Sequence, residues 1–346
     1  MEKELRIFTV NPADLAFCWE TEVFLSNLRK YNLSQKATVL IGYNKDTEEY
    51  LQYWYQLNDK YSECSFNYYD ISPIKNLLKV YLPIIRPYCL KLHFQKYPEL
   101  QEKAIYYTDS DCVFTQPFDF SPYQQDDTIY ASDIHSYNDH HYFDSKSKDV
   151  MFHKKQDYAK IDALDSCSKI VGISGEEIRK TSIMGGCQYI LKNIDWKFWE
   201  KVQNDCFKVK LMFNDINSTF FPSEEKGFQG WCTDLHVIWW NLLLRGDNLA
   251  TPEELDFNWA TTPIEEWNNK KIFHNSGLTK DFKEKNKGIF FDKSHSFFRS
   301  NMTTPFSDNI IWGEMNQDYC SYKYWRIIQD MKDTAITKVN KIKILK

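Results

Sequence analysis

Hydrophobic positions in the first third of the chain form short apolar runs, separated by longer segments in which apolar residues recur at helical spacing. The short runs are rich in β-branched, aliphatic and aromatic residues and predict strands at Leu5–Val10, Ala37–Gly42, Ser65–Tyr69 and Ala104–Thr108. The intervening segments predict two helices and a largely helical connection broken by prolines, at Phe17–Lys30, Thr47–Asp59 and 73–94. Strands that alternate with helices indicate a Rossmann-like α/β fold, with a mostly parallel central sheet flanked by helices.

The pattern changes after residue 115. A strand is predicted at Thr128–Ser132, ending at Asp133, and the polar segment 135–169 is interpreted as a long loop. We then predict a glycine-rich turn and strand, a helix, a loop, an apolar helix and a short strand, at Ile183–Leu191, Trp196–Phe213, 214–230, Trp231–Leu244 and Lys271–Gly277. No repeat or low-complexity linker separates these elements, which favours a catalytic domain over 1–280 and a C-terminal extension over 281–346 that ends in a basic tail.

The composition is that of a globular protein with a full core, because hydrophobic residues make up 42% of the 346 residues. A formal net charge of −5 excludes a basic field over the whole molecule but leaves room for a local basic groove. Nine scattered cysteines without a CxxC pair indicate a reducing compartment. The N-terminus lacks a signal-peptide layout and the longest apolar stretch, Val237–Leu244, is too short for a bilayer, so we expect a cytoplasmic protein without a membrane span.

Two aspartates, Asp109 and Asp111, directly follow the strand predicted at Ala104–Thr108. Strand alternation would place both carboxylates on one side and Ser110 on the other. Neighbouring carboxylates repel each other unless a positive charge lies between them, and a hard divalent cation that itself holds a substrate diphosphate meets that need. The alternative is a pair of solvated aspartates in a turn. Ligands bind at the carboxyl ends of parallel strands, where the sequence also places Thr9, Asn11 and Asp70.

An ordered set of features resembles the GT-A glycosyltransferases over residues 5–280. The set consists of the βαβαβ start, the strand ending in Asp-Ser-Asp, a Gly-Gly turn at Gly185 and Gly186, an aspartate-bearing helix with Asp234, and a late His-Asn-Ser-Gly from His274. The chain is less closely similar to the glycosyltransferases of DNA hydroxymethyl-pyrimidine modification and to the hydroxyproline arabinosyltransferases. That second similarity rests on the sequences YASD, GGCQY and FHNSG and on the tryptophan-rich helix.

The resemblance implies a nucleotide-sugar donor, usually of uridine diphosphate, at the strand ends. Thr9 and Asn11 would contact the nucleoside and Asp70 the base or ribose, although Asp70 equally suits a cap on the following turn. Further contacts to the sugar, the diphosphate or the acceptor are implied for Arg86, Asp133, Gly185, Gly186 and Gln188. The two glycines leave room for a ligand near the backbone or make a tight turn. Arg86 alternatively lies at the surface or at the rim of the core.

The resemblance also implies a metal site. Asp111 would bind the cation directly, Asp109 would bind it through water or hold the ribose, and His274 would complete the coordination, unless that histidine is structural. An imidazole among carboxylates favours Mn²⁺, with Mg²⁺ as a substitute. Asp234 is the candidate catalytic residue, because its tryptophan neighbours provide an apolar setting that suits a general base. It would deprotonate the acceptor in an inverting enzyme or orient the acceptor in a retaining one, and its alternative role is a helix N-cap.

Four histidines fall in or near the polar segment, at positions 135, 140, 141 and 153. No cysteine lies at zinc spacing from them, so we interpret the segment as a mobile loop over the donor rather than as a zinc site.

The sequence therefore predicts a metal-dependent glycosyltransferase that uses a nucleotide-diphosphate sugar, with UDP preferred. The predicted acceptor is a hydroxymethylated pyrimidine in DNA, and the alternative acceptor is a surface polysaccharide or a protein hydroxyl. Two further alternatives are a nucleotidyltransferase or sugar-nucleotide hydrolase, and a non-enzymatic binding module.

Overall fold

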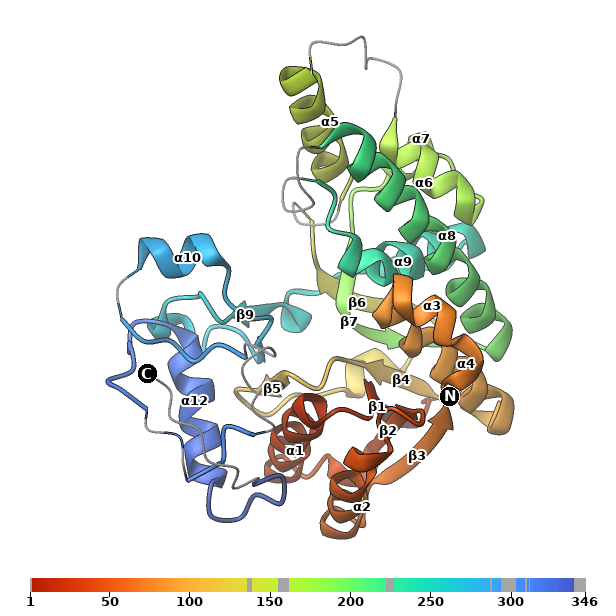
Figure 1. Ribbon diagram of the computed structural model, residues 1–346. Helices are drawn as coiled ribbons and strands as arrows, with labels where there is room; N and C mark the ends of the chain where they lie inside the picture. The colour runs from red at the N-terminus through yellow and green to blue at the C-terminus, as the bar shows by residue number, and fades with distance from the viewer. Residues whose placement is uncertain are drawn as a thin grey trace. The chain divides into compact units, whose positions relative to one another are not determined.

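The computed structural model describes residues 2–135, 139–154, 162–221, 227–286, 288–293, 303–308, 310 and 312–338 (Figure 1). The chain divides into two compact units, each assembled from separate segments. Unit 1 comprises residues 1–5, 73–107 and 121–253, and unit 2 comprises 6–72, 108–120 and 254–346. The domain boundary predicted after residue 280 does not separate the two units, because residues on both sides of it belong to unit 2.

Unit 2 begins with three parallel strands joined by helical crossovers. The elements are β1 (Leu5–Pro12), α1 (Leu15–Lys30), β2 (Ala37–Tyr43), α2 (Leu51–Lys60) and β3 (Ser65–Asp70). β2 pairs in parallel with both β1 and β3. Asp14 starts α1 by accepting a hydrogen bond from the backbone N–H of Ala16. All five predicted elements are thus confirmed in type.

The rest of unit 2 contains a small sheet and the last helix. The strands β5 (Cys112–Phe114), β10 (Ile272–His274) and β9 (Phe257–Trp259) lie in this order, and β10 runs antiparallel to β5. Helices α10 (Lys280–Lys285) and α12 (Cys320–Met331) follow. Tyr324 of α12 joins Trp19 of α1 and Phe273 of β10 in one buried core. The residues after 280 therefore take part in the hydrophobic core of unit 2.

A buried glutamate also ties the end of the described chain to α1. Both Glu22 oxygens accept hydrogen bonds, one from the backbone N–H of Ile336 at 2.8 Å and the other from that of Thr337 at 3.0 Å. The Lys60 ammonium lies 2.8 Å from the same carboxylate and balances its charge.

Unit 1 is richer in helix. Its elements are α3 (Lys75–Val80), α4 (Ile85–Lys96), β4 (Ala104–Tyr107), β6 (Ile129–Asp133), α5 (His140–Lys154), α6 (Ala163–Val171), α7 (Gly175–Arg179), β7 (Gly185–Leu191), α8 (Trp196–Phe220), α9 (Thr233–Arg245) and β8 (Leu249–Ala250). The strand β7 runs antiparallel to β4 and to β6, whereas β6 and β8 are parallel.

The predicted α/β class is confirmed. The strands lie in the order β3-β2-β1 within unit 2 and β4-β7-β6-β8 within unit 1, and helices flank the strands of each unit (Figure 1). The strand β7 departs from the parallel pattern, and sequence reasoning left its direction open. In the part of the chain described above, no helix combines the length and apolar character needed to cross a membrane. All nine cysteines are buried and free.

Three local predictions were wrong. The segment 135–169 contains α5 and most of α6 instead of a loop, because buried side chains such as Phe143 and Leu164 anchor these helices in unit 1. Residues 136–138 and 155–161 of that segment lie outside the described residues. The helix predicted to end at Phe213 continues to Phe220, since Ile216 and Asn217 extend its buried face. The Gly-Gly pair lies inside β7 and not in a turn.

Candidate cation site and the residues predicted with it

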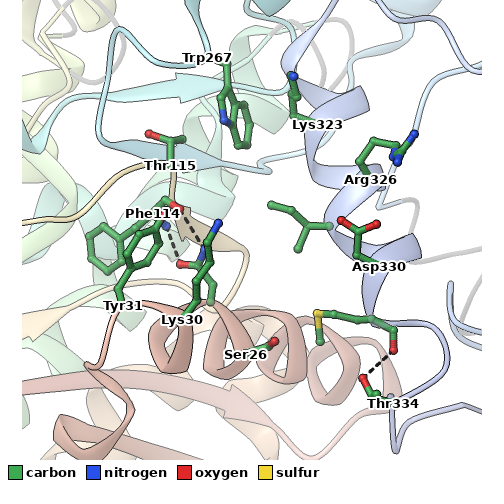
Figure 2. A pocket seen from close by; sticks show the side chains of 13 residues that line it. Ser26, Lys30, Tyr31, Phe114, Thr115, Trp267, Lys323, Arg326, Asp330 and Thr334 are labelled. Atoms are coloured by element: carbon green, nitrogen blue, oxygen red, sulfur yellow. Dashed lines mark hydrogen bonds between the residues drawn. The ribbon is translucent and has the colours of Figure 1, made fainter.

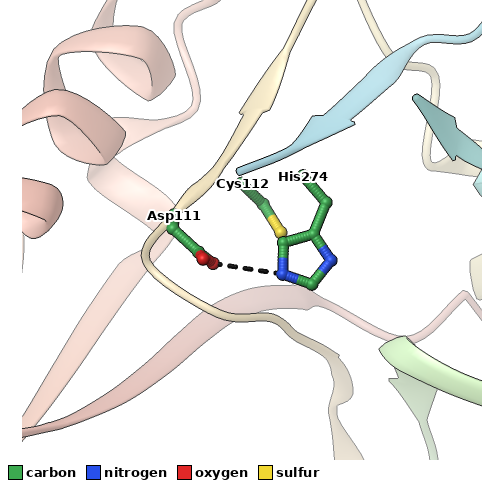
Figure 3. A group of neighbouring side chains, drawn as sticks. All are labelled: Asp111, Cys112 and His274. Carbon is green, nitrogen blue, oxygen red and sulfur yellow. Dashed lines mark ion pairs between the residues drawn. The ribbon is translucent and has the colours of Figure 1, made fainter. Parts of the chain in front are cut away.

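Asp109, Asp111 and His274, which the sequence predicted as cation ligands, lie together in unit 2, and cation binding by them stays a prediction. In the antiparallel pairing of β5 with β10, His274 is opposite Cys112, the residue that follows Asp111. The His274 Nε2 atom lies 3.3 Å from Asp111 Oδ1 and 4.0 Å from Asp109 Oδ2. Figure 3 shows the Asp111 carboxylate and the His274 ring facing each other, with the Cys112 sulfur beside the ring. Strand register therefore brings together residues far apart in sequence.

The two aspartates do not owe their arrangement to strand alternation. The strand β4 ends at Tyr107 and β5 begins at Cys112, so Asp109 and Asp111 lie in the connection. Buried Ser110 between them donates a hydrogen bond of 3.0 Å to the Asn11 Oδ1 atom. A polar contact of the middle residue thus holds the turn, and both carboxylates extend toward His274.

Lys293 is part of this group, and sequence reasoning missed it. Its ammonium forms an ion pair with Asp111 Oδ2, although the two residues are 182 positions apart. Burial would raise the pKa of Asp111, but Lys293 and His274 together lower that pKa below its ordinary value. Burial would lower the pKa of Lys293, but the charges of Asp111 and Glu20 outweigh it and raise that pKa. Both partners are therefore charged at neutral pH.

Several buried polar atoms in this group lack hydrogen-bond partners among the described residues. They are Asp111 Oδ1, His274 Nδ1 and both side-chain polar atoms of Asn275. Asn275 is fully buried, and its backbone N–H donates to the Asp111 carbonyl at 3.0 Å. A buried polar atom without a partner costs about 1–3 kcal/mol, and a ligand or water bonded to these atoms would remove that cost.

The chemistry of these side chains fits a divalent cation. One ligand atom each from Asp111, Cys112 and His274 lies within 4.8 Å of the others. A carboxylate oxygen and an imidazole nitrogen suit Mn²⁺, while the thiol also admits a softer metal. The Trp259 ring stacks on the His274 ring at 5.6 Å between centroids, and the Phe257 ring meets it edge-on at 5.2 Å. These contacts fix the orientation of the imidazole.

Thr9 and Asn11, predicted to contact the nucleoside, are both buried. The Asn11 amide lies 3.4 Å from Thr9 Oγ1 and 3.1 Å from Thr21 Oγ1, and Asn11 Oδ1 accepts the hydrogen bond from Ser110. In this structure Asn11 therefore connects β1, α1 and the turn that carries the aspartates. A contact of Thr9 or Asn11 with a nucleoside stays a prediction.

Asp70 is exposed at the end of β3. Its Oδ1 atom accepts a hydrogen bond of 2.8 Å from the backbone N–H of Ser72, as expected for a residue that caps the following turn. Hydrogen bonds from Ser72 also lower the pKa of Asp70. The contact of Asp70 with base or ribose stays a prediction.

Asp234 and Arg86 lie in unit 1 and form an ion pair that the sequence did not predict. The Arg86 Nη1 atom lies 2.8 Å from Asp234 Oδ2, and the Tyr81 hydroxyl lies 2.8 Å from Asp234 Oδ1. Asp234 is 1% exposed and lies in the first turn of α9, whose N-cap is Cys232. Both carboxylate oxygens are thus occupied. The side chain is not the N-cap of α9.

The predicted glycines and their neighbours also lie in unit 1. A Cβ atom on Gly185 would lie 2.4 Å from the Trp239 ring, and one on Gly186 would lie 2.5 Å from Ile134 Cδ1. Close packing of α9 and the β6 end against β7 accounts for both glycines. Gln188 is fully buried and accepts a hydrogen bond from Ser132, while Asp133 accepts one from the backbone N–H of His135 at 2.8 Å. Donor or acceptor contacts of these four residues stay predictions.

A separate cavity of about 470 Å³ lies in unit 2 (Figure 2). Three cationic side chains, Lys30, Lys323 and Arg326, line it together with a single acidic one, Asp330. Trp267 contributes an aromatic surface on the side of Thr115. None of the residues predicted from the sequence for the donor or the metal lines this cavity.

Comparisons with solved structures find similar glycosyltransferases, among them WbbM, mouse xyloside xylosyltransferase 1 and LgtC. The bifunctional glycosyltransferase WbbM, in its apo structure, matches at 9% identity and a TM-score of 0.42. The match covers 81% of this chain and 47% of that chain. The apo form of mouse xyloside xylosyltransferase 1 matches at 10% identity and a TM-score of 0.35, with coverages of 80% and 98%. The galactosyltransferase LgtC, in complex with donor and acceptor sugar analogues, matches at 9% identity and a TM-score of 0.39, with coverages of 94% and 95%.

This chain therefore spans about half the length of WbbM. No protein-family model and no curated protein matches it. All three TM-scores lie below 0.5.

Proposed function

We propose that this protein is a metal-dependent glycosyltransferase that moves a sugar from a UDP-sugar to an acceptor hydroxyl. The observation that carries the proposal is the convergence of Asp109, Asp111 and His274 with buried polar atoms that lack partners. In the transfer the bond from the anomeric carbon to the diphosphate oxygen breaks, and a bond to the acceptor oxygen forms. UDP leaves with the bonding electrons, and the acceptor proton passes to a base.

Asp111 and His274 would bind the cation directly, and Asp109, which is partly exposed, would bind it through water or hold the ribose. We favour Mn²⁺ because the set mixes carboxylate oxygen with imidazole nitrogen, and Mg²⁺ would substitute. When bound, the cation supplies Lewis-acid stabilisation of the departing diphosphate. The stacked ring of Trp259 keeps the imidazole in place for this contact.

Lys293 has a role in the same proposal. Its ammonium neutralises Asp111 in the structure, so a cation that binds Asp111 competes with an existing positive charge. We propose that Lys293 balances the buried carboxylate until cation and donor arrive and then donates hydrogen bonds to the diphosphate oxygens. An ammonium on a flexible stem suits such a change of partner.

Asp234 is better suited to positioning than to proton transfer. A general base needs a carboxylate oxygen that is available to a proton, but Arg86 Nη1 lies 2.8 Å from Asp234 Oδ2 and the Tyr81 hydroxyl lies 2.8 Å from Oδ1. We therefore propose that Asp234 fixes the orientation of Arg86 and Tyr81 in unit 1. If that is so, a neutral substitution at Asp234 affects stability more than it affects the pH dependence of turnover.

For the acceptor we propose a hydroxymethylated pyrimidine in DNA. The supporting observation is the cavity with Lys30, Lys323 and Arg326, a local basic surface on an otherwise acidic molecule. Phosphate contacts would make binding weaken as salt rises. Replacing both Lys323 and Arg326 by alanine should reduce DNA affinity and its salt dependence, whereas Lys283→Ala should change neither. Salt-independent or absent DNA binding would favour the polysaccharide or protein acceptor.

The function can be tested by thermal stabilisation of the purified protein with UDP, GDP and their common sugars, with and without Mn²⁺. A ligand at a hundredfold excess over its dissociation constant stabilises the native state by about 2.7 kcal/mol. We expect a Mn²⁺-dependent shift with UDP or a UDP-sugar, lost in Asp111→Asn and kept in the exposed control Asp59→Asn. The absence of any shift in the wild type would contradict the proposal and favour a binding module.

The products separate the two enzyme classes. A glycosyltransferase releases UDP and a glycosylated acceptor. In a sugar-nucleotide hydrolase water attacks the phosphorus and UMP and a sugar phosphate leave, and in a nucleotidyltransferase pyrophosphate attacks it and UTP and a sugar phosphate leave. Chromatography of the nucleotide products identifies which bond breaks.

A further inference from the structure

A second group of metal-ligating side chains lies in unit 1, where β6 leads into α5. One ligand atom each from His135, Asp139 and His141 lies within 4.8 Å of the others. The His135 Nε2 atom lies 3.4 Å from Asp139 Oδ2, and the rings of His135 and His141 are 5.7 Å apart between centroids. Sequence reasoning rejected a zinc site here for want of cysteines, but the fold supplies a carboxylate in their place.

Asp139 provides an independent sign of a ligand. Its side chain is 2% exposed, and its Oδ1 atom accepts a hydrogen bond of 3.0 Å from the backbone N–H of Tyr142. That bond caps the first turn of α5 and fixes the carboxylate. The other oxygen, Oδ2, is buried and accepts no hydrogen bond from any residue that the structure describes. It faces His135 Nε2, so the unsatisfied atom points into the cluster.

The histidine on the strand side has a fixed backbone. The Ile134 N–H donates to the Met184 carbonyl at 2.9 Å, and Ile134 itself is buried. The His135 N–H donates to Asp133 Oδ1 at 2.8 Å. These two hydrogen bonds hold the end of β6, so His135 starts from a defined position.

The helix side is anchored by aromatic packing. Phe143, which is 1% exposed, lies 5.2 Å from Phe228 and 5.9 Å from Trp240 between ring centroids. The Tyr142 hydroxyl accepts a hydrogen bond of 2.8 Å from the Gln229 N–H. The first turn of α5, with Asp139 and His141, is thus fixed to the core of unit 1. Ligands on two anchored elements are pre-organised for a shared ion.

We propose that His135, Asp139 and His141 bind a divalent transition-metal ion, with Zn²⁺ as the preferred metal. Two imidazoles and one carboxylate form a three-ligand set that leaves the fourth tetrahedral position for water. Ligand atoms at ~2.1 Å from a tetrahedral zinc lie about 3.4 Å from one another, which is the separation of His135 Nε2 and Asp139 Oδ2. The third ligand reaches the ion through rotation of the exposed His141 side chain.

The ion would satisfy Asp139 Oδ2 and hold the start of α5 to the end of β6. It differs in chemistry from the cation proposed at Asp111, because two imidazoles select zinc, cobalt or nickel over Mn²⁺ and Mg²⁺. The neighbouring His140 is outside the group, although its ring lies 4.0 Å from that of His141 between centroids. His140 therefore provides a matched control from the same turn of helix.

The test uses the full chain without an affinity tag, titrated with Zn²⁺ by calorimetry and with Co²⁺ by visible absorption. We expect a bound ion that survives His274→Gln and whose affinity falls at least about tenfold in Asp139→Asn and in His141→Gln. His140→Gln should keep the wild-type affinity. Tetrahedral cobalt bands should appear in the wild type and in His140→Gln.

His141 is exposed, so its variant tests the proposal without endangering the fold. An unchanged zinc affinity in both Asp139→Asn and His141→Gln would overturn the proposal. Loss of all zinc binding in His274→Gln alone would also overturn it, because the ion would then belong to the Asp111 group. Neither result depends on glycosyl transfer, so the proposed function and this site can fail separately.

Discussion

Two buried aspartates, Asp111 in unit 2 and Asp234 in unit 1, form ion pairs with a basic residue but differ in what surrounds the pair. Asp111 is 3% exposed and Asp234 is 1% exposed. Asp234 uses one oxygen for Arg86 and the other for Tyr81, so its hydrogen bonding is complete. Asp111 pairs one oxygen with Lys293, while the other lies 3.3 Å from His274 Nε2 without a well-formed hydrogen bond to any described residue.

The difference shows how two similar pairs can serve different purposes. A fully hydrogen-bonded buried carboxylate contributes to a defined native structure, and removing its partner is costly. A partly satisfied carboxylate beside other unsatisfied atoms keeps a cost that a ligand can remove. Burial and charge alone would have classed Asp111 and Asp234 together, whereas the count of hydrogen bonds separates them.

The largest effect is expected for Asp111→Asn. The variant loses a charged cation ligand, and donor turnover should fall about a thousandfold or more, which corresponds to about 4 kcal/mol in the activation barrier. Steady-state kinetics at saturating Mn²⁺ measure the loss. Asp59→Asn, an exposed change in the same unit, should keep full turnover. Wild-type turnover in Asp111→Asn would contradict the proposed role of Asp111 as a cation ligand.

Arg86→Met should lower the free energy of unfolding by about 2–4 kcal/mol, because it leaves Asp234 buried without a counter-charge. Urea denaturation followed by circular dichroism gives this value. The double variant Arg86→Met with Asp234→Asn should recover part of the loss, since the uncompensated charge is gone. Equal stability of wild type and Arg86→Met would contradict a structural role for the pair.

Lys293→Met should lower the stability of the metal-free protein by about 1–2 kcal/mol, because Asp111 loses its partner. The variant should then bind Mn²⁺ severalfold more tightly, since no ammonium competes for the carboxylate. Thermal denaturation with and without Mn²⁺ measures both effects. As a control, Lys283→Met removes an ammonium that lies 2.7 Å from Asp292 on a side chain that is 45% exposed, and it should change neither quantity. Weaker Mn²⁺ binding in Lys293→Met would contradict the proposed competition between the Lys293 ammonium and the cation for Asp111.

Tyr81→Phe should cost about 1 kcal/mol, the usual contribution of one hydrogen bond. The hydroxyl lies 2.8 Å from Asp234 Oδ1, and phenylalanine keeps the buried ring. Urea denaturation is again the measurement. A cost near zero would mean that water replaces the hydroxyl, and Asp234 would then be less closed than its geometry indicates.

The smallest effect on stability is expected for an exposed ion pair, that of Arg29 and Glu63. A side-chain hydrogen bond from Arg29 lowers the pKa of Glu63 to about 2. A lowered pKa means that the pair stabilises the protein above the unfolded value of about 4.3 and loses this contribution as the pH falls toward 2. Glu63→Gln should therefore cost about 0.5 kcal/mol at pH 7, with a difference from wild type that shrinks below pH 4.5. Urea denaturation of the wild type and of Glu63→Gln, at pH 7 and at a pH below 4.5, measures this difference.

Local patterns in the chain were enough to predict the α/β class and most elements of unit 2. Apolar runs and helical spacing are properties of neighbouring residues, so they can be recognised without any knowledge of the fold. They failed for α5, a polar helix that the buried Phe143 anchors, and for Gly185 and Gly186, which lie in close contact with Trp239 and Ile134.

The residues of the candidate site also fall into two groups, those that the sequence identified and those that only the fold brought together. Asp109, Asp111 and His274 could be chosen as candidates because carboxylates after a strand and a late histidine form a recognisable order in the sequence. The partners that distinguish one buried aspartate from another could not, because Lys293 is 182 positions from Asp111 and Arg86 is 148 positions from Asp234. Pairing over such distances is set by strand register and core packing, and so are the hydrogen bonds left unmade around Asp111.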